Sequence, residues 1–134
     1  MTKLTEIEGV GATYAEKLEQ IGITTTEMLL EKGATPKGRK ALVEESGISG
    51  KLILKWLNRA DLFRVKGIGE EYADLLEAAG VDTVPELAQR NSENLYHKLG
   101  EVNADKKLVR KVPSLSQVNG WVEHAKVLPR VLTY

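Results

Sequence analysis

The chain has 134 residues, of which 42% are apolar and 28% charged, a size and composition typical of one ordinary domain or of two small units that share a core. It contains no cysteine, which excludes disulfide frameworks, iron–sulfur clusters and thiolate zinc sites, and no apolar run approaches the ~20 residues that cross a bilayer. The net charge is zero, with 19 basic and 19 acidic residues, which counts against a dedicated nucleic-acid binder. Because the first residues also lack the apolar core of a signal peptide, we expect a cytoplasmic protein with no membrane partner.

The first predicted helix follows a glycine-containing turn near the start of the chain. Apolar side chains recur there at i, i+4 and i+7, in Tyr14, Leu18 and Ile21. Gly22 stands where the end of a helix favours a residue that tolerates positive φ. Thr24 and Glu27 then have the spacing of a capping box, which predicts a connector helix near residues 28–32.

Two further helices complete the first half of the chain. The dipeptide Thr35-Pro36 predicts a helix that opens with a first-turn proline, and Gly47 predicts its end. The next helix starts at Lys51 and continues to Phe63 or Arg64. Its apolar stripe has helical spacing and consists of Ile53, Trp56, Leu57 and Ala60.

The second half of the chain repeats the first. A shift of 58 residues places residues 7–18 over residues 65–76, with glycines, alanine and tyrosine at the same positions. Later in each half, a shift of 65 residues places Trp56 and its neighbours over Trp121 and its neighbours. The sequence therefore predicts two repeated units.

The repeat sets both the unit boundaries and the charge pattern. We expect one unit at residues 1–61 and the other at 62–134, with an insertion of about seven residues around Val112-Pro113-Ser114. Net charge alternates along the chain, with −4, +6, −7 and +5 in residues 1–31, 32–66, 67–105 and 106–134. The basic blocks lie in the second half of each unit.

The second unit has helix signals of its own. Apolar spacing repeats in Tyr72, Leu76 and Ala79. Thr83 with Glu86 makes a capping box, and Ser114 with Gln117 caps the helix of the second tryptophan. No segment alternates with period 2, so we predict an all-α fold of about eight to ten short helices.

A glycine motif opens each unit. Its positions are Leu4, Ile7, Gly9, Val10, Gly11, Ala15 and Leu18 in the first copy, and Leu62, Val65, Gly67, Ile68, Gly69, Ala73 and Leu76 in the second. Both copies resemble the helix-hairpin-helix family, whose modules often grip the backbone of duplex DNA without reading its sequence. Two full copies in one chain predict two tandem helix-hairpin-helix units that form one continuous body.

The physical basis of the motif is a tight reversal of two helices, at which glycine supplies backbone angles that other residues resist. We expect Val10 and Ile68 to pack between the helices, and the amides that start the next helix to face outward, where they suit a phosphate oxygen. The turn needs its glycines whether or not anything binds. Ala12-Thr13 follows the first hairpin but Glu70-Glu71 follows the second, and those carboxylates would repel a phosphate.

Basic side chains supply further candidate contacts. Cations recur at i, i+4 and i+8 opposite Trp56, after a segment, residues 46–51, that resembles a degenerate hairpin. The predicted nucleic-acid-binding residues of the first unit are Gly9, Val10, Gly11, Ala12, Lys37, Arg39, Lys40, Lys51, Lys55 and Arg59. A weaker set, with its cations at helical spacing, is Gly67, Gly69, Lys106, Lys107, Arg110 and Lys111. Such charged faces are also typical of solvated surface, or of a surface that binds a protein of complementary charge.

No arrangement of side chains predicts catalysis. His97 and His124 have no carboxylate or second histidine at a ligand interval, and no serine or lysine lies in a nucleophile arrangement. We expect a protein that is not an enzyme and that uses no metal and no cofactor.

The complete layout resembles the bacterial and archaeal family named domain of unknown function 4332. The resemblance rests on the two glycine hairpins, the segments that follow them and the segments around Trp56 and Trp121. It implies the fold and no function. We predict a non-catalytic module that binds the nucleic-acid backbone, DNA above all, independently of sequence. The alternative is a protein-interaction or scaffold module that uses its charge-alternating helical surface.

Overall fold

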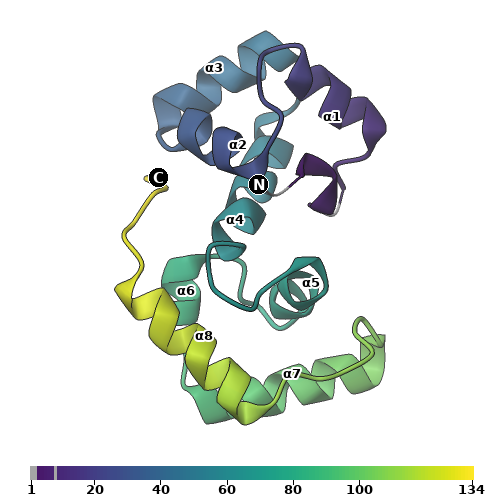
Figure 1. Cartoon of the computed structure of the whole chain (residues 1–134), viewed down its shortest axis with the longest axis vertical. Coiled ribbons are helices and arrows are strands. Elements are labelled where there is room, and N and C mark those ends of the chain that lie inside the picture. Colours follow the sequence, from purple (N-terminus) through teal and green to yellow (C-terminus); the bar gives the residue numbers. More distant parts are fainter. Residues whose placement is uncertain (1–2, 8) are drawn as a thin grey trace. The chain divides into compact units, whose positions relative to one another are not determined.

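The computed structural model describes residues 3–7 and 9–134, and within them every regular element is a helix (Figure 1). These elements are eight α-helices and one 3₁₀ helix, with an isolated antiparallel bridge between Lys3 and Thr25. The all-α prediction is confirmed. The chain divides into two compact units, which we call unit 1 (Met1–Asp61 with Arg130–Tyr134) and unit 2 (Leu62–Pro129).

Unit 1 contains η1 (Leu4–Glu6), α1 (Ala12–Glu19), α2 (Thr26–Gly33), α3 (Pro36–Ser46) and α4 (Gly50–Leu62). As predicted, α3 starts after Thr35, whose hydroxyl accepts a hydrogen bond from the Gly38 amide, and ends at Gly47. The predicted cap of α2 is wrong by one residue. Thr25, not Thr24, accepts the hydrogen bond from the Met28 amide, at 3.2 Å. The 58-residue shift places Thr25 over Thr83, so the repeat marks the cap better than the Thr24–Glu27 spacing does.

The core of unit 1 is centred on α4. Its apolar stripe is almost fully buried, with exposed fractions of 0–1% for Ile53, Trp56, Leu57 and Ala60. Helix α2 approaches this stripe at a glycine, because a Cβ at Gly33 would lie 2.7 Å from the Leu57 methyl carbons. Helix α4 ends at Leu62, one or two residues before the predicted end.

Unit 2 contains α5 (Glu70–Ala78), α6 (Val84–Ala88), α7 (Ser92–Lys106) and α8 (Leu115–Val127). Helix α8 packs against α6 and α7, and α5 packs against α7. The predicted box at Ser114 and Gln117 is confirmed as a reciprocal capping box. At Thr83 only half of the predicted box is present: the hydroxyl accepts from the Glu86 amide, while the Glu86 carboxylate accepts from Arg90 Nη2 at 3.2 Å. The core gathers side chains from all four helices, and those with no exposed surface include Leu75, Leu76, Leu87, Leu99 and Val118.

The last five residues pack with unit 1, although we expected them in the second unit. The Thr133 amide donates to the Ala34 carbonyl at 2.8 Å, and the Tyr134 hydroxyl donates to Asn58 Oδ1 at 2.6 Å. Leu132 between them is 2% exposed. This segment has no regular secondary structure and no counterpart in the first half of the chain, so neither periodicity nor the repeat could have placed it.

Candidate functional site

The first glycine motif, which we call the first hairpin, consists of Gly9–Gly11 and leads directly into α1. Gly9 has φ of 91°, Val10 is 3% exposed, and Gly11 is the N-cap of α1 with an extended backbone. The first hydrogen bond of the helical ladder runs from the Ala15 amide to the Gly11 carbonyl, at 3.0 Å. The amides at the start of α1 therefore lie outside the ladder, and Gly11 offers no side chain to cap them.

The corresponding hairpin of unit 2, at Gly67–Gly69, has the same backbone. Gly67 has φ of 93°, Ile68 is 5% exposed, and Gly69 is the N-cap of α5. The Ala73 amide donates to the Gly69 carbonyl at 2.9 Å. The two hairpins differ in the helical turn after the second glycine, since the first turn of α1 has no acidic residue whereas that of α5 has Glu70 and Glu71.

A tyrosine–tryptophan pair packs near each hairpin. The rings of Tyr14 and Trp56 have centroids 5.1 Å apart, and those of Tyr72 and Trp121 are also 5.1 Å apart. A Cβ at Gly9 would lie 3.6 Å from Trp56 Nε1. These aromatic residues are packing residues, and the first glycine of each hairpin is needed for the fold independently of any ligand.

A third turn repeats the hairpin backbone between α3 and α4. Gly47 has φ of 72°, and Ile48 is 2% exposed. Ser49 then accepts from the Ile53 amide through its carbonyl, and its hydroxyl accepts from the Leu52 amide at 3.3 Å. The segment we described as a degenerate hairpin therefore starts α4 with a side-chain cap that Gly11 and Gly69 lack.

The matching connection in unit 2 is a longer loop. Helix α7 ends at Lys106, Lys107 has φ of 53°, and α8 starts only at Leu115. The Asn103 side chain holds this loop by accepting from the Val109 amide at 2.9 Å and donating to the Val109 carbonyl at 3.1 Å. The predicted helical spacing of Lys106, Lys107, Arg110 and Lys111 is thus wrong, because the last three lie beyond the helix.

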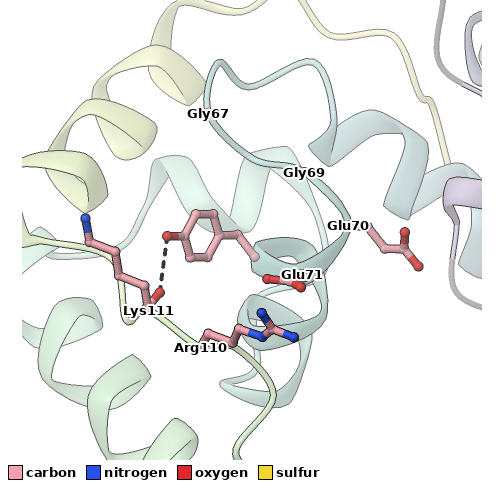
Figure 2. A pocket seen from close by; sticks show the side chains of 7 residues that line it. Gly67, Gly69, Glu70, Glu71, Arg110 and Lys111 are labelled. Atoms are coloured by element: carbon pink, nitrogen blue, oxygen red, sulfur yellow. Dashed lines mark hydrogen bonds between the residues drawn. The ribbon is translucent and has the colours of Figure 1, made fainter.

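This loop brings two of the predicted cations to the second hairpin (Figure 2). The Tyr72 hydroxyl donates to the Lys111 carbonyl at 3.2 Å, which joins α5 to the loop. The result is an open pocket of about 410 Å³ whose lining consists of Gly67, Gly69, Glu70, Glu71, Tyr72, Arg110 and Lys111. The seven-residue insertion was the sequence signal for this loop, but the repeat could not show where the loop folds.

The charges around this pocket are balanced. Two glutamates from α5 line the pocket together with Arg110 and Lys111, and in Figure 2 the Glu70 side chain points away from the loop while the Lys111 side chain extends away from both glutamates. Among the described residues, no ion pair within 4 Å joins these four side chains. The second hairpin is therefore close to neutral as a whole, whereas the first hairpin has no acidic residue in its helical turn.

The predicted cations of the first unit form two groups, the exposed lysines and the more buried arginines. Lys37, Lys40, Lys51 and Lys55 are exposed, although Lys55 already interacts with another group. Arg59 is only 4% exposed, so the predicted stripe of three exposed cations on α4 is wrong at its last member. A helix turns about 100° per residue, which places Arg59 about 60° from Trp56, at the edge of the apolar face rather than opposite it.

Arg39 has a structural role. Its Nη1 donates to the carbonyls of Gly33, at 2.9 Å, and Ala34, at 3.3 Å, and its Nη2 donates to the Thr133 carbonyl at 2.5 Å. The guanidinium also lies 5.7 Å from the centre of the Tyr134 ring. Arg39 thus fixes the last residues of the chain to the α2–α3 turn, and these bonds compete with any contact to a phosphate.

We also searched the described residues for a metal site, an available histidine and a membrane-spanning helix. No group of three or more histidine or acidic side chains there could hold a metal ion. His124 Nδ1 accepts a hydrogen bond from the Lys66 amide at 3.0 Å. No helix among these residues is both long enough and apolar enough to span a membrane.

Comparison with known proteins gives the family. No curated protein and no solved structure matches the chain. A family model described as "Domain of unknown function (DUF4332)" matches residues 8–128, which include both glycine hairpins except for the first residues of the first motif, and both tryptophans. The resemblance that we inferred from the repeated motifs is confirmed, and the chain belongs to the DUF4332 family.

Proposed function

We propose that unit 1 binds the phosphate backbone of nucleic acid, without catalysis and without reading the base sequence. The observation that carries this proposal is the amino end of α1. Gly11, Ala12 and Thr13 are exposed there, Gly11 at the N-cap has no side chain to cap the amides, and no acidic residue lies in the first turn of the helix. Such an end presents N–H donors and the positive end of the helix dipole to an anion.

Exposed lysines of the same unit supply the remaining attraction. A helix terminus alone contributes only about 0.3–1 kcal/mol at an exposed position, so binding also needs side-chain cations. Lys37, Lys40 and Lys51 are exposed in unit 1. Arg39 and Arg59 are left out of the proposed contact set because of their hydrogen bonds and burial, respectively.

Titration of a fluorescent DNA duplex at two salt concentrations tests the proposal. With three or four neutralised phosphates, affinity should fall roughly 100-fold between 50 and 200 mM salt. The variant Ala12→Glu/Thr13→Glu gives the first hairpin the residues that follow the second. It should weaken binding about 3- to 30-fold, since each helix-terminal charge is worth about 0.3–1 kcal/mol.

The variant Gln89→Glu/Ser116→Glu is the matched control. It adds the same charge at exposed positions of unit 2 and should bind almost as the parent does. Failure of the parent to bind at low salt, or equal losses in the two double variants, would contradict the proposal.

A separate observation favours protein contact as a second candidate function for unit 2. Leu108 and Leu115, at the two ends of the loop that carries Arg110 and Lys111, are 40% and 43% exposed. Apolar side chains beside balanced charges are typical of protein interfaces rather than of phosphate sites. Light scattering at low and high salt should then show self-association that Leu108→Ser/Leu115→Ser removes.

A further inference from the structure

The chain returns from unit 2 to unit 1 over residues 130–134, which we call the return segment. Unit 2 begins at Leu62, directly after Asp61 of unit 1, and ends at Pro129, directly before the return segment. The chain therefore joins unit 2 to unit 1 at both of its ends. One of these connections runs within helix α4, whereas the other has no regular secondary structure. The second connection can therefore open without the loss of any helix.

Thr133 fixes the main chain of the return segment to the turn between α2 and α3. Its amide and its hydroxyl both donate to the Ala34 carbonyl, at 2.8 and 3.2 Å, and its own carbonyl accepts from Arg39 Nη2 at 2.5 Å. Arg39 Nη1 donates to the carbonyls of Gly33 and Ala34, neither of which belongs to the return segment. The guanidinium therefore stays bound to this turn when the segment leaves.

Two side chains of the return segment give the contact its specificity. Leu132 is buried, with 2% of its surface exposed. Tyr134 donates its hydroxyl to Asn58 Oδ1 on α4 at 2.6 Å, and the centre of its ring lies 5.7 Å from the Arg39 guanidinium. Unit 1 thus recognises a leucine that is followed two positions later by an aromatic residue with a hydroxyl group.

Little buried surface holds the return segment in place. Leu132 is the one buried residue among the five, Val131 is half-buried, and Arg130, Thr133 and Tyr134 are exposed. Few buried apolar contacts and exposed hydrogen bonds are typical of segments that open locally well before a protein unfolds. The return segment has both features.

We propose that the return segment is a releasable latch. In the closed state, which the structure shows, unit 2 is held at both of its ends. In the open state unit 2 remains attached through α4 alone and moves more freely, and the site that Leu132 and Tyr134 leave is available to another peptide of the same pattern. The tether keeps the effective concentration of the segment in about the millimolar range, so a competing peptide must reach a similar concentration to displace it. The latch does not depend on the nucleic-acid binding proposed for unit 1.

The substitution Leu132→Ser removes the one buried side chain of the latch and should open it. In the ¹⁵N-labelled whole chain, the Thr133 amide should exchange with solvent at least about tenfold faster than in the parent, because its bond to Ala34 is lost. ¹⁵N relaxation should give shorter rotational correlation times for α5–α8, since unit 2 then tumbles more independently. Val127→Ser is the matched control and should change neither quantity, because Val127 is 76% exposed and precedes the latch.

A second variant opens the latch without a change at the buried leucine. Thr133→Pro leaves Leu132 in place and removes the amide that donates to Ala34. It should also shorten the correlation times of unit 2. In both variants, slow amide exchange at Leu57 and Leu76, which are buried in units 1 and 2, reports that both units remain folded.

A synthetic peptide of residues 128–134 tests the recognition pattern in trans. Titrated to about 5 mM into the Leu132→Ser protein, it should shift the amide signals of Ala34 and Asn58 saturably, with a dissociation constant at or below about 3 mM. The same peptide with Leu132→Ser should leave both signals in place. The proposal is overturned if Leu132→Ser leaves the motion of unit 2 as it is in the parent, or if the unchanged peptide shifts neither signal.

Discussion

The hairpins at Gly9–Gly11 and Gly67–Gly69 have the same backbone and different surroundings. Both place a glycine at positive φ, bury the next side chain and start a helix without a side-chain cap. After the first hairpin come Ala12 and Thr13; after the second come two carboxylates and a loop with two cations. The shared glycines thus reflect the fold, and the residues around them are what distinguish one hairpin chemically from the other.

The largest expected effect is on the free energy of unfolding, and it differs between the two hairpins because their first glycines pack differently against the tryptophans. A Cβ at Gly67 would lie 3.0 Å from Trp121 Nε1, closer than the 3.6 Å between a Cβ at Gly9 and Trp56 Nε1, and both glycines have positive φ. Gly67→Ala should lower the free energy of unfolding by about 2–4 kcal/mol and Gly9→Ala by about 1–3 kcal/mol. Urea denaturation followed by tryptophan fluorescence measures both.

The second glycine of each hairpin provides the control for this prediction. Gly11 and Gly69 have extended backbones with φ of −82° and −104°, and no atom lies within 4 Å of a Cβ built at either. Alanine there should cost less than about 1 kcal/mol, because only the N-cap preference is lost. Equal costs at all four glycines would show that neither positive φ nor the tryptophans constrain these turns.

An intermediate effect is expected from the loop that distinguishes the second hairpin. Asn103 makes two hydrogen bonds to the backbone of Val109, which is 7% exposed. Asn103→Ala leaves that amide and carbonyl without their partner and should lower the free energy of unfolding by about 1–3 kcal/mol. Asn103→Asp keeps the acceptor for the Val109 amide but not the donor, so its cost should be smaller. Equal stability of the parent and Asn103→Ala would mean that the side chain does not hold the loop.

Much of the fold could be predicted from the sequence because it depends on local signals. Thr35-Pro36, Gly47 and the Ser114–Gln117 box mark helix ends through hydrogen bonds over three or four residues, and the structure has all of them. The one misplaced cap, at Thr24, competed with a second threonine directly beside it. The cap agrees instead with the 58-residue repeat, which aligns Thr25 with the capping residue Thr83.

The candidate site could be predicted only in part because it depends on contacts between distant residues. The charge pattern identified Arg39 as a cation, but its bond to the Thr133 carbonyl joins residues 94 positions apart. Helical spacing also failed for Arg110 and Lys111, since Lys107 ends the helix with a left-handed backbone that side-chain periodicity does not indicate. The helical apolar spacing of Tyr72 predicts no polar contact, yet its hydroxyl donates to the Lys111 carbonyl across 39 positions in the sequence.

The smallest expected effect tests whether Glu70 and Glu71 alone make the second hairpin a weaker DNA-binding site than the first. Glu70→Ala/Glu71→Thr gives the second hairpin the sequence of the first, next to Arg110 and Lys111. If the charge of the first helical turn determines the affinity for DNA, this change should strengthen DNA binding several-fold, since each helix-terminal charge is worth about 0.3–1 kcal/mol. The measurement uses the Ala12→Glu/Thr13→Glu background, in which binding through the first hairpin is weakened, and anisotropy of a labelled duplex at low salt. Arg110→Ala/Lys111→Ala should remove the gain in affinity.

If Glu70→Ala/Glu71→Thr brings no gain in DNA affinity, the charge of the first helical turn does not explain the difference between the hairpins. Binding at the amino end of α1 then depends on the lysines of unit 1 as well.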